Sequence, residues 1–98
     1  FRESVYHKAL AREMELRGIK FVSEPSLKVD YKGVNVGTHE PDFVVEDEVV
    51  VQLKVAEAIN DVHVVQLVSS LKATGKKIGL ILNFAKKTMR EGIRRVVL

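Results

Sequence analysis

The stretch 41–54 constrains the fold of this chain more than any other part of the sequence. Two β-branched runs, Val44-Val45 and Val49-Val50-Val51, flank the polar segment Glu46-Asp47-Glu48. Runs of this kind favour strands, and a segment too polar to bury between them favours a turn. The pattern therefore predicts a β-hairpin.

Three polar residues occupy positions where a purely structural strand would be apolar. Asp42 opens the first strand of the hairpin, and Gln52 and Lys54 lie in the second, on the same face. A three-residue loop at 46–48 places Asp42 opposite Gln52, within about 5 Å between Cβ atoms, and creates one polar cluster. A two-residue loop instead places Asp42 opposite Val51, on the other face. The candidate site depends on the first register.

The remaining chain alternates between helical and strand-like patterns. Apolar residues recur at helical spacing over 1–17, and Asn60 or Asp61 can cap a second helix that runs to about Ala73. Gly18 and Gly75 suit the two helix ends. The other predicted elements are an extended piece at 19–22, a half-buried strand at 26–31, a turn at 32–33, a strand covered on both faces at 77–84, a helical turn at 88–91 and a strand at 93–98. The order predicts an α/β fold with a mixed sheet flanked by helices, a central hairpin and a crossover helix from Asp61.

Length and composition restrict the class of protein. The 98 residues suit a single domain, 1–98, and 46% hydrophobic with 30% charged residues is typical of globular proteins. The chain has no cysteine, which excludes disulfides and cysteine-based zinc sites and fits a cytoplasmic location. Its longest apolar run, 78–82, is too short for a membrane span, and no secretory signal opens it. The helical pattern starts abruptly at residue 1, so we expect a further helical segment upstream.

The net charge of +3 hides an asymmetry between the two parts of the chain. Residues 1–61 hold 8 basic and 12 acidic residues, a balance of −4, whereas residues 62–98 hold 8 basic and 1 acidic residue, a balance of +7. A basic half favours a polyanionic partner such as nucleic acid, although solvated helix and loop side chains explain it equally well. The candidate phosphate contacts are Lys76, Lys77, Lys86, Lys87, Arg90, Arg94 and Arg95.

The predicted polar cluster has the chemistry of a hard-cation site. The Asp42 carboxylate, the Gln52 amide oxygen and the Leu53 carbonyl are oxygen ligands of the kind that Mg²⁺ takes while it keeps several waters. Such an ion activates water and offsets charge on a phosphoryl oxygen, and the Lys54 ammonium adds to this stabilisation or orients the water. This is the chemistry of phosphodiester hydrolysis.

These residues resemble a known family. Pro41-Asp42 followed by Gln52-Leu53-Lys54 is similar to the PD-(D/E)XK nuclease signature, with Gln in the acidic position. The likeness to its GxxExxY branch extends over nearly the whole chain, and Glu3 and Tyr6 match the Glu and Tyr of that name, whose Gly would precede residue 1. The other matching segments are 1–6, 31–33, 45–47, 66–67, 71–75 and 79–84. The resemblance implies a restriction-endonuclease-like fold with an αβββαβ core, nuclease chemistry dependent on Mg²⁺ or Mn²⁺, and a nucleic acid partner.

The sequence departs from this family at two positions. The family usually carries Glu where Gln52 stands, and the lost charge should weaken cation binding, although Mrr-like nucleases are similar to this chain in using Gln-x-Lys. The family often shows Gln-x-x-x-Tyr on the crossover helix, whereas Gln66 is followed here by Ser70. Gln66 is a candidate contact to a phosphate or to the metal's water, or else a helix-to-sheet hydrogen bond.

Glu3 and the histidines are weaker candidates. Glu3 lies one helical turn from His7 and can either reach the metal site or serve as a surface or capping residue. His7 and His39 are predicted to lie on the surface, because three scattered histidines show no metal-ligand spacing.

Three functions remain open at this point. The first is a metal-dependent nuclease, with Asp42, Gln52, Lys54, Glu3 and Gln66 as candidate catalytic residues. The second is a nuclease-fold binding module that lost its chemistry when Gln replaced the acid. The third is a structural protein whose cluster is a hydrogen-bond network. A homodimer is one way for so small a domain to span a duplex, and the sequence does not choose between DNA and RNA or between endo- and exonuclease action.

Overall fold

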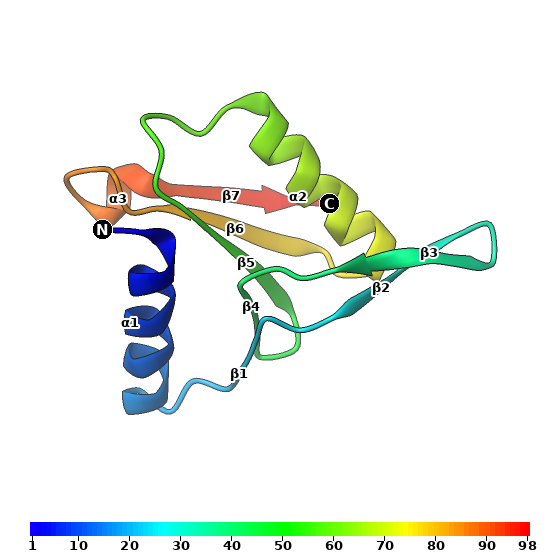
Figure 1. Ribbon diagram of the computed structural model, residues 1–98, viewed down its shortest axis with the longest axis horizontal. Helices are drawn as coiled ribbons and strands as arrows, with labels where there is room; N and C mark the ends of the chain where they lie inside the picture. Colours follow the sequence, from blue (N-terminus) through cyan, green and yellow to red (C-terminus); the bar gives the residue numbers. More distant parts are fainter.

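The computed structural model describes residues 1–98, which form three helices and seven strands. In chain order these are α1 (Glu3–Leu16), β1 (Phe21–Ser23), β2 (Leu27–Tyr31), β3 (Val34–His39), β4 (Phe43–Val45), β5 (Val49–Lys54), α2 (Asp61–Thr74), β6 (Ile78–Asn83), α3 (Met89–Gly92) and β7 (Ile93–Val97), as Figure 1 shows. The helices predicted at 1–17, 61–73 and 88–91 and the strands predicted at 77–84 and 93–98 are all present, with ends shifted by one or two residues.

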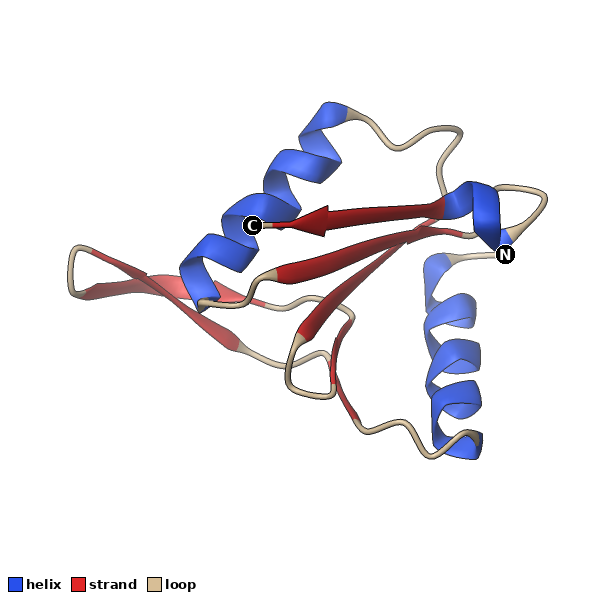
Figure 2. Ribbon diagram, turned by 180° about the vertical axis from the view of Figure 1, so that it is seen from behind, coloured by secondary structure: helices blue, strands red, loops and turns tan.

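Five strands form one mixed sheet in the order β1-β4-β5-β6-β7 (Figure 2). Only β5 and β6 are parallel, because α2 carries the chain from the end of β5 back to the start of β6. The predicted hairpin is β4 and β5, in which Val44 pairs with Val50 and Val45 with Val49. A three-residue loop at 46–48 requires this register, and the prediction is confirmed.

The side chains of β5 alternate between two apolar clusters, one on each face of the sheet. The cluster on the α1 side contains Met14, Phe43, Val51 and Leu53. The cluster on the α2 side contains Val44, Val50, Leu67, Leu71 and Ile81. Gln52 and Lys54 share the parity of Val50, so they lie on the α2 side, beyond the end of that cluster. The predicted sheet flanked by helices is therefore confirmed.

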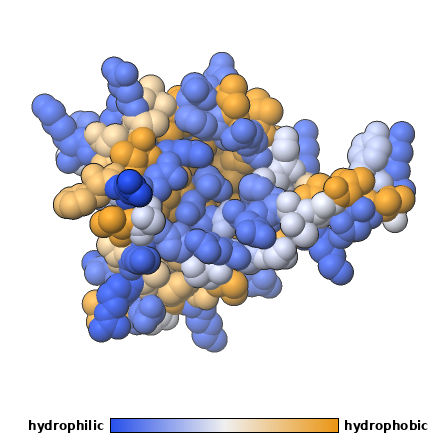
Figure 3. Space-filling model, in the orientation of Figure 1, coloured by the Kyte–Doolittle hydropathy of each residue, from blue (hydrophilic) through white to orange (hydrophobic).

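Strands β2 and β3 form a separate two-stranded ribbon that projects from the body (Figures 1 and 3). The segment 26–31 was expected to be a half-buried strand, and Leu27 and Val29 are half-buried, but Tyr31 is 62% exposed, and Val34 and Val36 near the tip are similarly exposed. The physical reason is that β1 and β5 already pair with both edges of β4, which leaves no edge of the hairpin for β2. Only the base of the ribbon, at Leu27, packs against the α2-side cluster.

Local signals fix both ends of α2 as predicted. The Asn60 side chain accepts a hydrogen bond from the His63 N–H, and the Asn60 N–H donates to His63 Nδ1, which completes a capping box. Gly75 follows the last turn with φ of 73°, a left-handed conformation that glycine adopts without strain. None of the three helices has the length and apolar character needed to cross a bilayer.

Candidate active site

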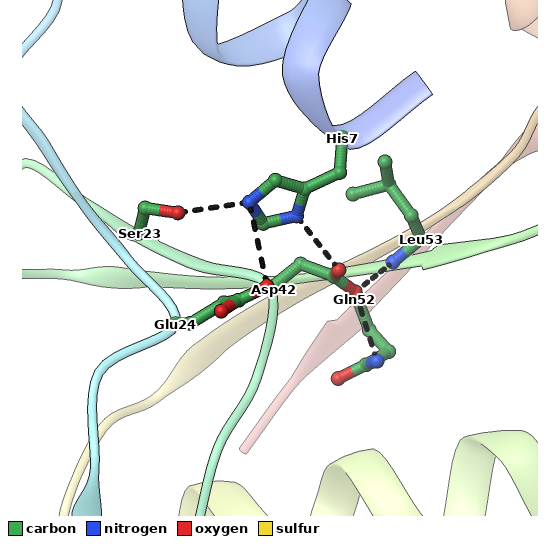
Figure 4. A network of polar contacts seen from close by, with 6 residues as sticks. All are labelled: His7, Ser23, Glu24, Asp42, Gln52 and Leu53. Carbon is green, nitrogen blue, oxygen red and sulfur yellow. Dashed lines mark hydrogen bonds and ion pairs between the residues drawn. The ribbon is translucent and has the colours of Figure 1, made fainter. Parts of the chain in front are cut away.

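Asp42 lies at the entry to β4, directly after the fully buried Pro41. Its carboxylate accepts three hydrogen bonds, as Figure 4 shows. The Leu53 N–H and Gln52 Nε2 donate to Oδ2 at 2.8 and 2.9 Å, and His7 Nδ1 donates to Oδ1 at 2.9 Å. The contact between Asp42 and Gln52 that the register predicts is therefore present. Because each carboxylate oxygen offers about two lone-pair positions, Oδ1 keeps room for one further ligand.

His7 belongs to this cluster, and the prediction that it is a surface residue is wrong. Its ring stacks on Phe43 with centroids 4.2 Å apart, and its side chain is only 12% exposed. A carboxylate only accepts, so Nδ1 donates to Asp42, and in the neutral ring Nε2 then accepts from the Ser23 hydroxyl at 2.8 Å. His7 lies seven residues before the buried Met14, on the same helical face. That spacing was the signal in the sequence.

Gln52 and Lys54 form the floor of a groove of about 490 Å³ on the α2 side of the sheet. One wall is α2, and the other is the base of the ribbon. The lining residues are Val29, His39, Gln52, Lys54, His63, Val65, Gln66, Leu67, Ser69, Ser70, Ala73 and Ile81. They include a lysine and no carboxylate. The Lys54 ammonium is held by no hydrogen bond or ion pair within the protein, so it is available to an anion in the groove.

The other two candidate catalytic residues, Gln66 and Glu3, lie on opposite faces of the sheet. Gln66 lines the groove opposite the floor formed by Gln52 and Lys54, so these three residues meet in one space. Glu3 comes from α1, on the other face of the sheet, where its Oε1 accepts a hydrogen bond from the Val55 N–H at 3.3 Å. Glu3 thus contacts the backbone directly after Lys54 without entering the groove. His39, predicted to lie on the surface, is half-buried and lines the groove.

The basic candidates lie at two ends of the sheet. Lys54 pairs with Asn83 in the parallel strands, so Lys86 and Lys87, which follow β6, lie at the end of the sheet where Lys54 does. Arg90 is exposed on α3, at the same end. Lys76 and Lys77 precede β6 and lie about 17–20 Å away along the strand. There Lys76 Nζ forms an ion pair with Asp47 at 3.3 Å.

Comparison with known proteins identifies the family. A family model described as the PD-(D/E)XK nuclease superfamily matches residues 1–96. The chain belongs to this superfamily. A search among curated proteins finds no match.

A solved structure of an alkaline exonuclease (LHK-Exo) from Laribacter hongkongensis is similar to the chain, with a TM-score of 0.66 and 14% sequence identity. The alignment covers 96% of this chain and 55% of the exonuclease, so the chain spans about half the length of that protein. At this identity the likeness shows the fold alone. That fold is the restriction-endonuclease-like fold of PD-(D/E)XK nucleases, as predicted.

The PD-(D/E)XK signature maps onto the cluster residue by residue. Pro41 and Asp42 resemble its first part, and Gln52, Leu53 and Lys54 resemble its second, with Gln in the acidic position. PD-(D/E)XK nucleases generally use divalent metal ions. No group of three or more His, Asp or Glu side chains of this chain gathers closely enough to hold a metal. The other groups beside Asp42 that can bind a cation include neutral oxygens.

The Leu53 carbonyl is one such oxygen. The Lys54 carbonyl accepts a hydrogen bond from the Phe84 N–H, so the peptide groups of Lys54 point toward β6. Successive residues of a strand point their backbone groups to opposite sides, which turns those of Leu53 toward β4. The ladder between β4 and β5 ends at Phe43 and Val51, so beyond it the Leu53 carbonyl lies on the Asp42 side without a strand partner. The donor set fits a hard cation that takes its other ligands from water and substrate.

Proposed function

We propose that the chain is a divalent-metal-dependent nuclease of the GxxExxY branch, in its Gln-x-Lys form, that hydrolyses phosphodiester bonds in nucleic acid. One observation carries the proposal: Gln52 bonds Asp42 across the ends of adjacent strands, and Gln52 and Lys54 both line a groove without carboxylates.

Asp42 Oδ1, the amide oxygen of Gln52 and the Leu53 carbonyl are the residues that would hold Mg²⁺ or Mn²⁺. When bound, the ion supplies Lewis-acid stabilisation of a phosphoryl oxygen and a water that ionises more easily. Gln52 now directs its Nε2 at Asp42. Ligation therefore requires the amide to turn over, so that its oxygen faces the carboxylate. With only one charged ligand, we expect cation binding to be weak until the substrate phosphate adds a second negative group.

The other side chains act on the substrate and on Asp42. Lys54 lies on the groove floor and places a positive charge where the phosphoryl group gains negative charge in the transition state. Gln66 offers its amide from the opposite wall to a phosphate oxygen or to the attacking water. His7 holds Asp42 in one orientation through its Nδ1 hydrogen bond and acts as a positioning residue. A catalytic role for Glu3 requires that its contact to Val55 be exchanged.

The charge distribution supports an approach of nucleic acid from the end of the sheet that carries Lys54. Lys86, Lys87 and Arg90 all lie at that end. Phosphate contacts to basic side chains position a nucleic acid and make its binding depend on salt. Lys76 and Lys77 can contact the same molecule only if it extends along the length of β6.

The proposal is tested by incubating the protein with single- and double-stranded DNA and RNA in Mg²⁺ or Mn²⁺. We expect cleavage that stops in EDTA and falls at least about 100-fold in Asp42→Asn and in Lys54→Met, since each change removes charge stabilisation from the transition state. Lys72→Met is the matched control, because Lys72 is exposed on α2 and does not line the groove. Wild-type cleavage rates in both site variants would refute the assignment of Asp42 and Lys54 as catalytic residues. A lack of cleavage of every substrate would refute the proposed nuclease activity.

One observation favours a second candidate, a nucleic-acid-binding module without catalysis. The Asp42 carboxylate is already satisfied by three donors, one of them the Gln52 amide that replaces the family's acid. This candidate predicts salt-dependent binding of nucleic acid with no cleavage in Mn²⁺. Gln52→Glu would then be expected to raise cation affinity or to create cleavage.

A further inference from the structure

The walls of the groove carry polar groups that the signature residues leave unexplained. His63 and Gln66 belong to α2, and His39 belongs to the base of the ribbon. No group of the protein forms a hydrogen bond with the His39 ring or the Gln66 amide, in contrast to His7, both of whose ring nitrogens are bonded. The His39 ring is half-buried without a partner, which favours a polar ligand in the groove, whereas the exposed Gln66 amide can bond to water or to a ligand.

The capping box fixes the proton of His63. Its ring atom Nδ1 accepts a hydrogen bond from the backbone N–H of Asn60 at 3.3 Å. The backbone N–H of His63 donates to Asn60 Oδ1 at 3.1 Å. When one nitrogen of a neutral imidazole accepts, the other must carry the proton. Nε2 of the neutral ring is therefore a hydrogen-bond donor on the side of His63 away from the cap. His63 lines the groove, and no group of the protein accepts a hydrogen bond from its Nε2.

The size and charge of the groove restrict the ligand. A volume of about 490 Å³ lies in the range that holds one small molecule, so it suits one nucleotide of an extended strand rather than a segment of duplex. Lys54 is the only charged group among the lining residues, which favours an anion. Val29 and the 62% exposed Val65 supply apolar surface for a base face, and the His39 imidazole supplies a stacking surface.

We propose that this groove binds a single nucleic acid strand and that His63 donates from Nε2 to a phosphate oxygen of that strand. The inference rests on the proposed nuclease function and adds its substrate class, a single strand, and a substrate-contacting residue. His63 contacts the substrate beside the scissile bond, while Asp42 and Lys54 act at the bond itself. Duplex can reach the floor of the groove only after its end has separated.

Binding is measured by fluorescence anisotropy with a labelled single-stranded oligonucleotide and with the same sequence as a duplex, both in EDTA so that no cleavage occurs. His63→Leu is the test variant, because Leu offers no donor to a phosphate while the Asn60 side chain still caps the N–H of position 63. His63→Glu keeps the same cap and adds a negative charge to the groove. Lys72→Gln, on the same helix but outside the groove, is the control.

We expect the wild-type protein to bind single strands more tightly than duplex. His63→Leu should raise Kd for the single strand about tenfold, the usual effect of losing one hydrogen bond to a charged group. His63→Glu should raise it further, and Lys72→Gln should change it less than threefold. Thermal melting of each variant confirms that the fold is intact, and if His63→Leu is unfolded then His63→Glu decides.

Equal affinities of the wild type and both folded His63 variants would overturn the inference, as would a preference for duplex. These outcomes differ from a failure of the proposed function. If the protein cleaves nucleic acid in Mn²⁺ but the His63 variants bind normally, only the groove assignment is wrong. If single strands bind and depend on His63 while nothing is cleaved, the binding site stands and the nuclease does not.

Discussion

Replacing Gln52 by Glu should make the stability of this protein depend on divalent cations. Gln52 Nε2 donates to Asp42 Oδ2 at 2.9 Å, and both side chains are largely buried at the strand ends. Gln52→Glu removes that hydrogen bond and places two carboxylates against each other. At pH 7.5, without a cation between them, the pair repels.

The size of the effect follows from the contact distance. Two unit charges about 4 Å apart interact by about 4 kcal/mol at the effective dielectric of a protein surface. Rotation of the new side chain toward water relieves part of this, so we expect a loss of about 2–4 kcal/mol in the free energy of unfolding. A chain of this length has a total of about 5–15 kcal/mol, and each 1 kcal/mol shifts Tm by about 4–8 °C. The melting temperature in EDTA should therefore fall by about 8 °C or more.

Circular dichroism melts in EDTA, Mg²⁺ and Mn²⁺ measure this shift. A cation at about 100 times its Kd restores about 2.7 kcal/mol, so saturating metal should return most of the lost Tm in Gln52→Glu. Gln66→Glu is the matched control, since it adds the same charge to the groove wall with no carboxylate among the lining residues. An unchanged Tm for Gln52→Glu in EDTA, or a loss that neither metal reverses, would refute the geometry of the site.

Three further substitutions test the packing around the site, each by urea denaturation. His7→Ala removes a charged hydrogen bond to Asp42 and an aromatic stack, and should cost about 2–4 kcal/mol; a cost below about 0.5 kcal/mol would contradict the contact. Asn83→Leu should cost about 2–4 kcal/mol, because the buried amide bonds both the N–H and the carbonyl of Ala56; a neutral result would mean that the loop is not held there. Gly92→Ala should cost about 3 kcal/mol or more, because its Cβ would meet the Asn83 carbonyl oxygen, and normal stability would show that α3 docks differently.

The hairpin register was predictable because both of its determinants are local. The loop 46–48 and the two valine runs that flank it lie within about twelve residues of one another. A shift of the register by one residue would turn the apolar face of the strand to solvent. The ends of α2 were predictable for the same reason, since Asn60 and Gly75 act on adjacent backbone groups. The pairing of Asp42 with Gln52 follows directly from that register.

The ribbon and His7 depend on contacts that the local pattern does not contain. An alternating strand at 26–31 has the same sequence signature whether it joins the main sheet or a separate ribbon. The short strand β1 pairs with the free edge of β4, so β2 cannot join the main sheet there and forms the ribbon with β3. His7 meets Asp42 across 35 residues, and only the docking of α1 against Phe43 brings them together. Helical spacing gives the face of His7 but not what that face packs against.

Gln52 gives this site a property that an acid at the same position would lack. An amide has a donor end and an acceptor end, whereas an ionised carboxylate only accepts. Without a cation, Gln52 satisfies Asp42 through Nε2, and with one it can offer its oxygen by turning over. A Glu at this position would bind the cation more strongly but would repel Asp42 in its absence. If the site binds a cation, Gln at position 52 would therefore lower the metal affinity and raise the stability without metal, and the difference between the Tm changes of wild type and Gln52→Glu in EDTA measures this effect.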